Sequence, residues 1–254
     1  MDVLDGKTAV VTGASRGLGR AIAERLAAQG VRVVGLARDK DRLQDLAAHV
    51  PKGRGDILQV AGDITDAELA RQVLAEWSPD LVILSAGVNG PMKPVDEMSW
   101  DEFSTTWNTD VKGALFWGQA AVNLPLRPGS EVVIMSSGAA IAGSPLSGGY
   151  AGAKRTQWFL AGYLQRVSDA KDLGIRFRVV LPKRIIGETD LGRAAAEGYA
   201  ARQGITVERF LKNFGTPMGP AEFADFFERA LVEAPFADAR TIGIAGDGPE
   251  VIEA

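Results

Sequence analysis

The chain of 254 residues contains no cysteine and a single histidine, His49. The lack of cysteine excludes disulfide bonds and thiolate catalysis, and it is compatible with a reducing compartment. His49 ends an amphipathic segment and is expected on the surface, and no group of histidine and carboxylate residues has the spacing of metal ligands. The sequence therefore predicts no metal site.

Long apolar runs and an excess of charge of one sign are also missing. No stretch reaches the roughly 20 apolar residues of a membrane helix, and the charged N-terminal residues 1–7 resemble neither a signal peptide nor a transit peptide. The 28 basic and 32 acidic residues give a net charge of −4, which argues against a nucleic-acid or membrane-surface partner. These properties predict a soluble protein of the cytoplasm.

Short β-branched runs alternate with longer amphipathic segments along the chain. The apolar character of several runs indicates strands that are buried on both faces, as in a parallel sheet. The expected strands are Thr8–Thr12, Val31–Leu36, Asp56–Val60, Leu81–Leu84, Glu131–Met135, Phe177–Leu181 and a short final strand, Thr241–Ile244. The expected helices are Leu18–Gln29, Asp39–His49, Asp66–Trp77, Trp100–Leu124, Tyr150–Ala170 and Pro220–Glu233. This alternation predicts an α/β fold with a doubly wound parallel sheet and helices on both faces.

No repeat, low-complexity segment or linker divides the chain. We therefore expect residues 1–254 to form a single domain. The least regular part, residues 187–219, is interpreted as a late insertion with one or two short helices.

A glycine-rich turn, Thr12-Gly-Ala-Ser-Arg-Gly-Leu-Gly19, joins the first expected strand to the first expected helix. Its glycines allow a tight turn and a close approach of a pyrophosphate to the backbone, where free N–H groups and the helix dipole favour an anion. The alternative is a glycine turn with a packing role only. The candidate cofactor-binding residues of this turn are Gly13, Ser15, Arg16, Gly17, Leu18 and Gly19.

The residues after the second expected strand indicate which cofactor is preferred. An acidic residue at this point would bind the ribose hydroxyls of NAD, but the chain has Ala37-Arg38 instead. Arg38 and Arg16 would suit the additional 2′-phosphate of NADP, because a guanidinium group makes bidentate charge-assisted hydrogen bonds. NADP(H) is therefore favoured over NAD(H), unless both arginines are simply solvated.

Two further turns complete the expected cofactor site. Asp63 and Ile64 follow the third strand and suit an adenine contact, although Asp63 or Thr65 could instead cap the next helix. Ala86 and Gly87 follow the fourth strand, where small residues would let a cofactor lie against the backbone. Loop packing alone would also explain these two residues.

Tyr150 and Lys154 lie four residues apart in an expected helix. This spacing places both side chains on one helix face, one turn apart. A cation beside a phenol stabilises the phenolate and makes the hydroxyl usable as an acid or base near neutral pH. The motif alone is common on surface helices, so its meaning depends on the other motifs.

Together with Ser136-Ser137 and Pro182, the order and spacing of these motifs resemble the short-chain dehydrogenase/reductase family, in its compact subfamily of about 250 residues. The resemblance implies a Rossmann-like sheet of seven parallel strands, a nicotinamide cofactor and reversible carbonyl–alcohol chemistry. It implies that Tyr150 is the general acid or base, that Lys154 holds the nicotinamide ribose, and that Ser137 binds the substrate carbonyl. Ser136 is interpreted as structural, because strand alternation points it to the other face.

The first departure from the family pattern is Asp110, which stands three residues before Gly113 where the family has asparagine. Asn108 could replace that asparagine only through a local bulge, because two residues turn an α-helix by about 200°. The family asparagine supports a water that relays protons to the lysine. An aspartate can accept from this water but not donate, and its charge opposes ionisation of a neighbouring phenol. Asp110 is therefore expected to tune the pH optimum or to reduce activity.

Two further departures affect the edges of the expected site. Leu84-Ser85-Ala86-Gly87 replaces the family's Asn-Asn-Ala-Gly, and Pro182-Lys183 replaces its Pro-Gly. Thr189, a candidate contact for the nicotinamide carboxamide, lies two residues later than the pattern requires. The loop between the sixth strand and the insertion is therefore expected to be remodelled.

In the family, the late insertion forms a lid over the substrate. Its apolar residues favour an apolar alcohol or ketone as the substrate, or alternatively they only pack the insertion onto the core. A second wall is expected from residues 143–149. The apolar residues in question are Leu191, Tyr199, Phe210, Phe214 and Met218.

The expected helices Trp100–Leu124 and Tyr150–Ala170 carry apolar residues on more than one face. This pattern agrees with the family's pairing of these helices in homodimers and homotetramers, or with burial in the core of one chain. The leading hypothesis is an NADP(H)-dependent oxidoreductase of ketones and secondary alcohols. The alternatives are a catalytically weak or inactive cofactor-binding regulatory protein, and an epimerase or dehydratase that uses the same residues.

Overall fold

A computed structural model of the chain describes residues 3–49, 55–213 and 217–253. Its centre is one sheet with the strand order β3-β2-β1-β4-β5-β6-β7-β8, in which every neighbouring pair is parallel except β7 and β8. The reversal of order between β1 and β4 is the doubly wound topology expected from the sequence. The strands are β1 (Thr8–Thr12), β2 (Arg32–Ala37), β3 (Ile57–Ala61), β4 (Leu81–Leu84), β5 (Glu131–Met135), β6 (Arg176–Pro182), β7 (Thr241–Ala245) and β8 (Gly248–Val251).

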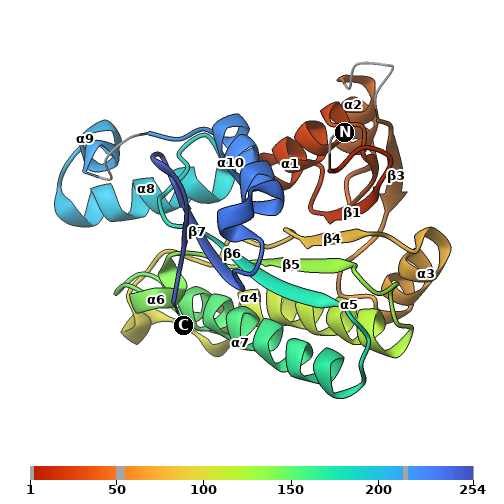
Figure 1. Cartoon of the computed structure of the whole chain (residues 1–254). Coiled ribbons are helices and arrows are strands. Elements are labelled where there is room, and N and C mark those ends of the chain that lie inside the picture. The colour runs from red at the N-terminus through yellow and green to blue at the C-terminus, as the bar shows by residue number, and fades with distance from the viewer. Residues whose placement is uncertain (1–2, 50–54, 214–216, 254) are drawn as a thin grey trace.

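Helices cover both faces of this sheet, in three layers (Figure 1). One face carries α1, α2 and α10, and the other carries α3, α5 and α7. The helices are α1 (Gly17–Ala28), α2 (Lys40–His49), α3 (Ala67–Trp77), α4 (Trp100–Thr106), α5 (Lys112–Asn123), α6 (Ala139–Ala142), α7 (Gly149–Ala170), α8 (Asp190–Gln203), α9 (Val207–Lys212) and α10 (Pro220–Val232).

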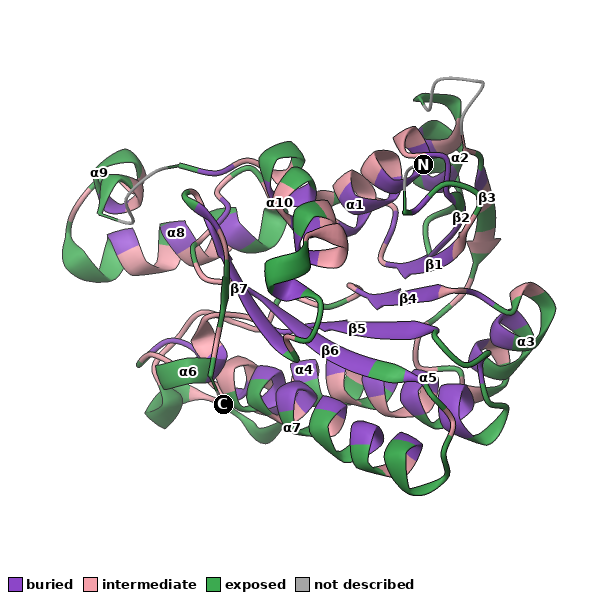
Figure 2. Cartoon of the chain, viewed as in Figure 1, coloured by how far each residue is buried: buried purple, intermediate pink, exposed green. Residues whose placement is uncertain are grey.

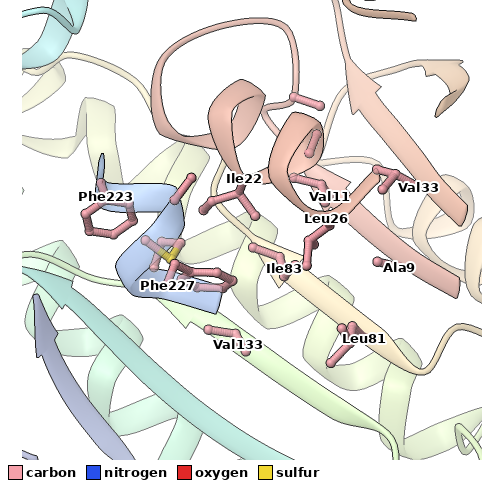
Figure 3. Packing of buried hydrophobic residues seen from close by; sticks show 14 of the residues in the cluster. Ala9, Val11, Ile22, Leu26, Val33, Leu81, Ile83, Val133, Phe223 and Phe227 are labelled. Carbon is pink, nitrogen blue, oxygen red and sulfur yellow. The ribbon is translucent and has the colours of Figure 1, made fainter. Parts of the chain in front are cut away.

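The alternation of side chains along the buried strands divides the core into two clusters. In β1, Ala9 and Val11 pack under α1 and α10 with Phe227, whereas Val10 packs on the opposite face with Trp117 of α5. Figure 3 shows the first cluster, with Phe223 and Phe227 of α10 facing Ile22 of α1. All of these side chains are at most 1% exposed, and the parallel strands other than the edge strand β3 are almost uniformly buried in Figure 2. This double burial explains why the strand sequences are nearly continuously apolar.

The seven strands expected from the sequence are present, and so are all the expected helices except Trp100–Leu124, with ends shifted by one residue in several cases. An eighth strand, β8, was not predicted. It returns antiparallel to β7 after a turn at residues 246–247. The first residue of β8, Gly248, has φ +116°, and Ile242 pairs with Val251. Because β8 is a short edge strand that begins with glycine and proline, its sequence carries no clear strand pattern.

The prediction of one continuous helix over Trp100–Leu124 was wrong. A five-residue π-helical segment, Trp107–Val111, separates α4 from α5. Such a segment inserts an extra residue into the helical turn and shifts the side chains that follow it. Apolar periodicity does not detect a single inserted residue, so the sequence pattern alone suggested an uninterrupted helix.

The late segment contains α8, of 14 residues, and the shorter α9. The expectation of one or two short helices was therefore correct in number, but it underestimated α8. In Figure 1 these two helices extend beyond the end of the sheet, beside α10. Within the described ranges, no helix combines the length and apolar character that crossing a membrane requires.

Candidate functional site

A large cleft of about 1280 Å³ opens at the carboxyl ends of the parallel strands, where the strand order reverses between β1 and β4. Ligands of doubly wound folds bind at this edge of the sheet. Every site residue expected from the sequence lines this one cleft, although the residues come from segments far apart in the chain. The tertiary structure thus brings the expected cofactor and reaction residues together.

The glycine-rich turn after β1 forms a narrow cradle at one end of the cleft. A Cβ atom on Gly13 would lie 2.7 Å from the Cα of Ala86, and Gly13 has φ +72°. A Cβ on Gly19 would lie 2.4 Å from the carbonyl oxygen of Gly13. The N-terminus of α1 has no side-chain cap and no acidic residue in its first turn, so its N–H groups remain available to an anion. This geometry fits the pyrophosphate of a dinucleotide.

Arginines surround the cleft at the end of β2. Arg38 is exposed and forms no ion pair with any described residue, and Arg42 of α2 lines the cleft beside it. Arg42 pairs with Asp39 at 3.3 Å. Arg16 instead pairs with Asp190 at the start of α8. Of the two arginines expected from the sequence, only Arg38 has a guanidinium that no carboxylate holds.

Asp63 lies in the turn after β3 and does not cap the next helix. Its Oδ1 accepts hydrogen bonds from the backbone N–H of Thr65 at 2.8 Å and from the Thr65 hydroxyl at 2.9 Å. The Thr65 N–H is the main cause that holds the pKa of Asp63 below its ordinary value, against a smaller opposing effect of burial, and Arg38 contributes in the same direction. The residue that caps α3 is Asp66, which accepts from Glu68 and Leu69. The sequence suggested Asp63 or Thr65 as possible caps of this helix, but neither of them caps α3.

Asp110 projects from the π-helical segment into the centre of the site. Its side chain is 1% exposed, and Oδ2 lies 3.0 Å from the Nζ atom of Lys154. Its other oxygen, Oδ1, accepts the backbone N–H of Val88 at 3.0 Å, just beyond β4. A Cβ on Gly87 would lie 2.8 Å from Oδ2. Asp110 therefore joins α7 to the loop that leaves β4.

Asn108 does not take the place of the family asparagine, although the bulge it would have needed is present. It is exposed, and its Nδ2 donates to the Ser104 hydroxyl at 3.3 Å. The π-helical segment therefore presents Asp110, rather than Asn108, to the site.

Lys154 is buried between α7, β5 and the π-helical segment. Its Nζ donates to the carbonyl oxygen of Met135 at 3.3 Å and lies 5.6 Å from the centre of the Tyr150 ring. Burial lowers the pKa of Lys154, but the charges of Asp110 and Tyr150 outweigh this effect, so the pKa lies above its ordinary value. Lys154 is thus an ammonium group, held by a carboxylate and close to the ring of Tyr150.

The two serines after β5 differ in their contacts. The hydroxyl of Ser136 is buried and donates to the carbonyl oxygen of Lys154 at 2.8 Å. The hydroxyl of Ser137 is half-buried and accepts the Ala139 N–H at 3.2 Å, which leaves its proton free to donate. Ser136 is therefore tied to α7, whereas Ser137 can offer a proton to a ligand in the cleft.

In the loop after β6, both Lys183 and Thr189 have partners within the chain. Lys183 pairs with Glu250 of β8. The hydroxyl of Thr189 caps α8, because it accepts the Gly192 N–H at 3.0 Å and donates to the Ile186 carbonyl at 2.9 Å. Thr189 lies beside Gly17, but its hydroxyl proton is already used. A hydrogen bond from this hydroxyl to a nicotinamide carboxamide would therefore require breaking its hydrogen bond to the Ile186 carbonyl.

The apolar residues of the late segment lie in two different places, the cleft and the main core. Leu191, Tyr199 and Phe210 line the cleft, and the Tyr199 and Phe210 rings stack at 5.6 Å. Met218 instead packs into the main core with the residues of α1 and α10. Phe214 lies outside the described residues.

Several cleft residues were missed by the sequence analysis. Arg42 belongs to an amphipathic helix and gave no signal beyond its charge. Ser144 and Ser147 lie in the expected second wall of the cleft. The sequence did not single out their hydroxyls, because the contact of Ser144 with Tyr199 is visible only in the tertiary structure. Among the described residues, no three histidine or carboxylate side chains are placed to hold a metal ion.

Comparisons with known proteins agree with this geometry. Residues 7–200 match the short chain dehydrogenase family. The 3-oxoacyl-[acyl-carrier-protein] reductase of Escherichia coli K12 is 29% identical over 250 residues, which cover 95% of this chain and 97% of that protein. The NADPH-dependent pterin aldehyde reductase of Arabidopsis thaliana is 29% identical over 65% of this chain and 69% of its own.

A similar solved structure is a short chain dehydrogenase from Burkholderia cenocepacia in complex with NADP. It has a TM-score of 0.77 and 24% identity, and the match covers 96% of this chain and 98% of the other. The sheet topology and the family match lead to one conclusion. The chain belongs to the short-chain dehydrogenase/reductase family of NAD(P)-dependent oxidoreductases that act on CH–OH and C=O groups.

Proposed function

We propose that the protein is an NADP(H)-dependent oxidoreductase that interconverts a ketone and a secondary alcohol. The observation that carries this proposal is the position of Ser137, Tyr150 and Lys154 in the same cleft as the glycine-rich cradle. A dinucleotide seated on the cradle would extend along the cleft toward these three side chains.

The side chains divide the reaction as follows. The nicotinamide cofactor, when bound, supplies the hydride in reduction and accepts it in oxidation. Ser137 donates a hydrogen bond to the carbonyl oxygen and stabilises the negative charge that develops there. Tyr150 donates its proton to that oxygen in reduction and removes it from the alcohol in oxidation. Lys154 holds the ribose hydroxyls and stabilises the tyrosinate that remains.

The preference for NADP(H) rests on the end of β2. Arg38 is followed by Asp39, but the carboxylate of Asp39 is paired with Arg42, so Arg38 is available to a 2′-phosphate. The Arabidopsis relative is NADPH-dependent by its name, which supports the same preference. Arg42, whose partner Asp39 is exposed, is a second candidate phosphate ligand.

We also propose that residues 1–254 act as one domain in which residues 187–219 form a lid. Helix α8 approaches the glycine-rich turn through Asp190 and the loop after β4 through Gly198, where a Cβ atom would lie 3.0 Å from Met92. A helix that touches both of these walls lies across the cleft. It can therefore exclude water from the reacting carbonyl.

An oligomer is the proposed assembly, either a homodimer or a homotetramer. Helix α7 has one buried face, yet Phe159 and Tyr163 on its other side are 46% and 57% exposed and stack at 6.3 Å. Trp107 beside α7 is 37% exposed. An aromatic surface on one helix is suited to pairing with the same surface of a second copy.

The test is consumption of NADPH, followed by its absorbance, with a panel of ketones, diketones and 3-oxoacyl thioesters. We expect turnover by the wild type and a loss of about a thousandfold or more in Tyr150→Phe, since general acid catalysis contributes on this scale. Affinity for NADPH, measured by its fluorescence, should change little in this variant. Equal rates for the two proteins would contradict the role of Tyr150.

A cofactor-binding protein without turnover is the second candidate, and the Asp110–Lys154 ion pair favours it. The negative charge of Asp110 neutralises the ammonium group of Lys154 and so weakens its stabilisation of the Tyr150 phenolate, without preventing cofactor binding. Tight NADPH binding without consumption by any ketone, in both wild type and Asp110→Asn, would support this candidate. Consumption of NADPH in proportion to the product would exclude it, and would exclude a non-redox reaction as the main activity.

A further inference from the structure

Three hydroxyl groups meet in the wall of the cleft, where the late segment approaches the loop that precedes α7. The Ser144 hydroxyl is in hydrogen-bond contact with the Tyr199 hydroxyl of α8 and lies 2.8 Å from the Ser147 hydroxyl. It also accepts the backbone N–H of Leu146 at 3.3 Å. All three hydroxyl side chains line the cleft that contains Ser137 and Tyr150.

The hydrogen atoms of this cluster do not all have acceptors. Each hydroxyl has one proton to donate, and the chain Tyr199–Ser144–Ser147 contains only two hydroxyl–hydroxyl hydrogen bonds. The Ser144 hydroxyl already accepts the Leu146 N–H, so it can accept from only one of the other two hydroxyls and must donate to the other. The remaining hydroxyl at one end of the chain, Ser147 or Tyr199, then keeps its proton. Within the described ranges neither of these two hydroxyls has another acceptor.

The surroundings of the cluster make this spare proton significant. Ser147 is 7% exposed and Tyr199 is half-buried, with its ring stacked on Phe210. Leu191 and Ala195 of α8 line the same cleft and offer no polar side-chain atom. A donor partly shielded from water gains more from a ligand oxygen than an exposed donor does.

We propose that Tyr199, Ser144 and Ser147 form a specificity site that binds a second oxygen atom of the substrate, in addition to the carbonyl or hydroxyl that reacts. This inference rests on the proposed function, since Ser137 and Tyr150 would hold the reacting oxygen. The preferred substrates are then dicarbonyl compounds, hydroxyketones or oxoesters. A purely apolar ketone of the same length fills the apolar part of the cleft but leaves the spare proton without an acceptor.

The experiment measures binding without reaction. A ketone cannot be reduced by NADP⁺, so calorimetry with NADP⁺-loaded protein gives its affinity independently of turnover. The probes are hexanone and the isomeric hexanediones, which differ in the separation of their two carbonyl groups. The variants are Tyr199→Phe, which keeps the ring stack on Phe210, and Tyr199→Phe combined with Ser144→Ala and Ser147→Ala, which removes all three hydroxyls of the cluster. Tyr163→Phe, which loses a hydroxyl on the exposed side of α7, is the matched control.

At least one hexanedione should bind the wild type about fivefold to tenfold more tightly than hexanone, as expected for one net hydrogen bond. The triple variant should lose this difference, and Tyr163→Phe should keep it. Equal affinities of hexanone and all the diones for the wild type would overturn the proposal, as would the absence of binding by any of them. A difference that persists in the triple variant would overturn it as well.

The same probes separate this inference from the proposed function. A hexanedione that binds more tightly than hexanone to the wild type but not to the triple variant, and is not reduced by NADPH, would refute the proposed reaction and leave the specificity site supported. Conversely, reduction of hexanone and of the hexanediones with equal kcat/KM, together with equal affinities, would support the reaction and refute the specificity site.

Discussion

Asp110 and Lys154 form a buried ion pair, with Oδ2 and Nζ separated by 3.0 Å and side chains that are 1% and 8% exposed. The two residues come from different elements, the π-helical segment and α7, and Asp110 also holds the loop after β4 through Val88. Burial of an ammonium group lowers its pKa, and the charge of this carboxylate is the largest effect that holds the pKa of Lys154 above its ordinary value. Asp110 is a positioning residue that acts through Lys154.

Asp110→Asn should destabilise the protein at neutral pH by about 3 kcal/mol, because removing one partner leaves a buried charge uncompensated. In the wild type the pKa of Lys154 is raised, so the stabilisation is complete below the ordinary value of 10.5 and is lost as the pH rises through the folded-state value. In the variant, burial dominates and the pKa of Lys154 should fall below that of the unfolded chain. The difference in the free energy of unfolding should therefore shrink between neutral pH and alkaline pH, as urea titrations would measure.

The matched control is Glu131→Gln, which breaks a second buried pair in β5 and β6. Arg178 is 1% exposed and lies 2.9 Å from Glu131. An arginine stays protonated across the accessible pH range, so this variant should lose stability by an amount that does not change between neutral and alkaline pH. A parallel pH dependence in the two variants would refute the assignment to Lys154.

Ser137→Ala should mainly lower the rate of the reaction, whereas Ser136→Ala should mainly lower the stability of the protein. Loss of a donor to the reacting oxygen lowers kcat by about a hundredfold, so we expect this effect in Ser137→Ala with little change in stability. Ser136→Ala removes a buried hydrogen bond to the Lys154 carbonyl and should cost about 1 kcal/mol of unfolding free energy. Steady-state kinetics and urea unfolding of both variants test this assignment, and a larger kinetic defect in Ser136→Ala would reverse it.

Arg38→Ala should weaken NADPH binding by roughly tenfold or more, because a charge-assisted hydrogen bond to the 2′-phosphate is lost. The affinity of Arg38→Ala for NADH, which lacks this phosphate, should remain within about twofold of the wild-type affinity. Arg32→Ala provides a control on the same strand, since Arg32 pairs with Asp56 outside the cleft. Fluorescence titrations with both cofactors would decide. An equal loss for NADPH and NADH would mean that Arg38 does not recognise the phosphate.

Phe159→Asp should reduce the size of the oligomer, because it places a charge in the aromatic surface of α7. Val251→Asp, on the edge strand β8, introduces the same charge at a side chain that is 50% exposed. Light scattering after size-exclusion chromatography should show a smaller assembly for Phe159→Asp. If only Val251→Asp changes the assembly, the contact between copies lies at the sheet edge rather than on α7.

The parallel strands and most helices could be predicted because each follows from a local pattern. The run Leu81–Leu84 is apolar throughout because both faces of β4 are covered. Such a run can be identified as a strand without knowing which strands pair with it. The glycine-rich turn after β1 and the Tyr150–Lys154 spacing were equally local signals. The π-helical segment in the helix that begins at Trp100 gave no such local signal, because one inserted residue leaves the apolar pattern almost unchanged.

The sequence by itself determined the fold class, the family and many, but not all, of the side chains that line the cleft. Only the tertiary structure decided what those side chains do to one another. It turned Asp110 rather than Asn108 inward against Lys154, used the Thr189 hydroxyl as a helix cap, moved Met218 into the core, and joined Tyr199 to Ser144. Each of these outcomes depends on distances between elements that are far apart in the chain. A local pattern fixes which face a residue occupies, whereas the partner on that face depends on how the elements pack.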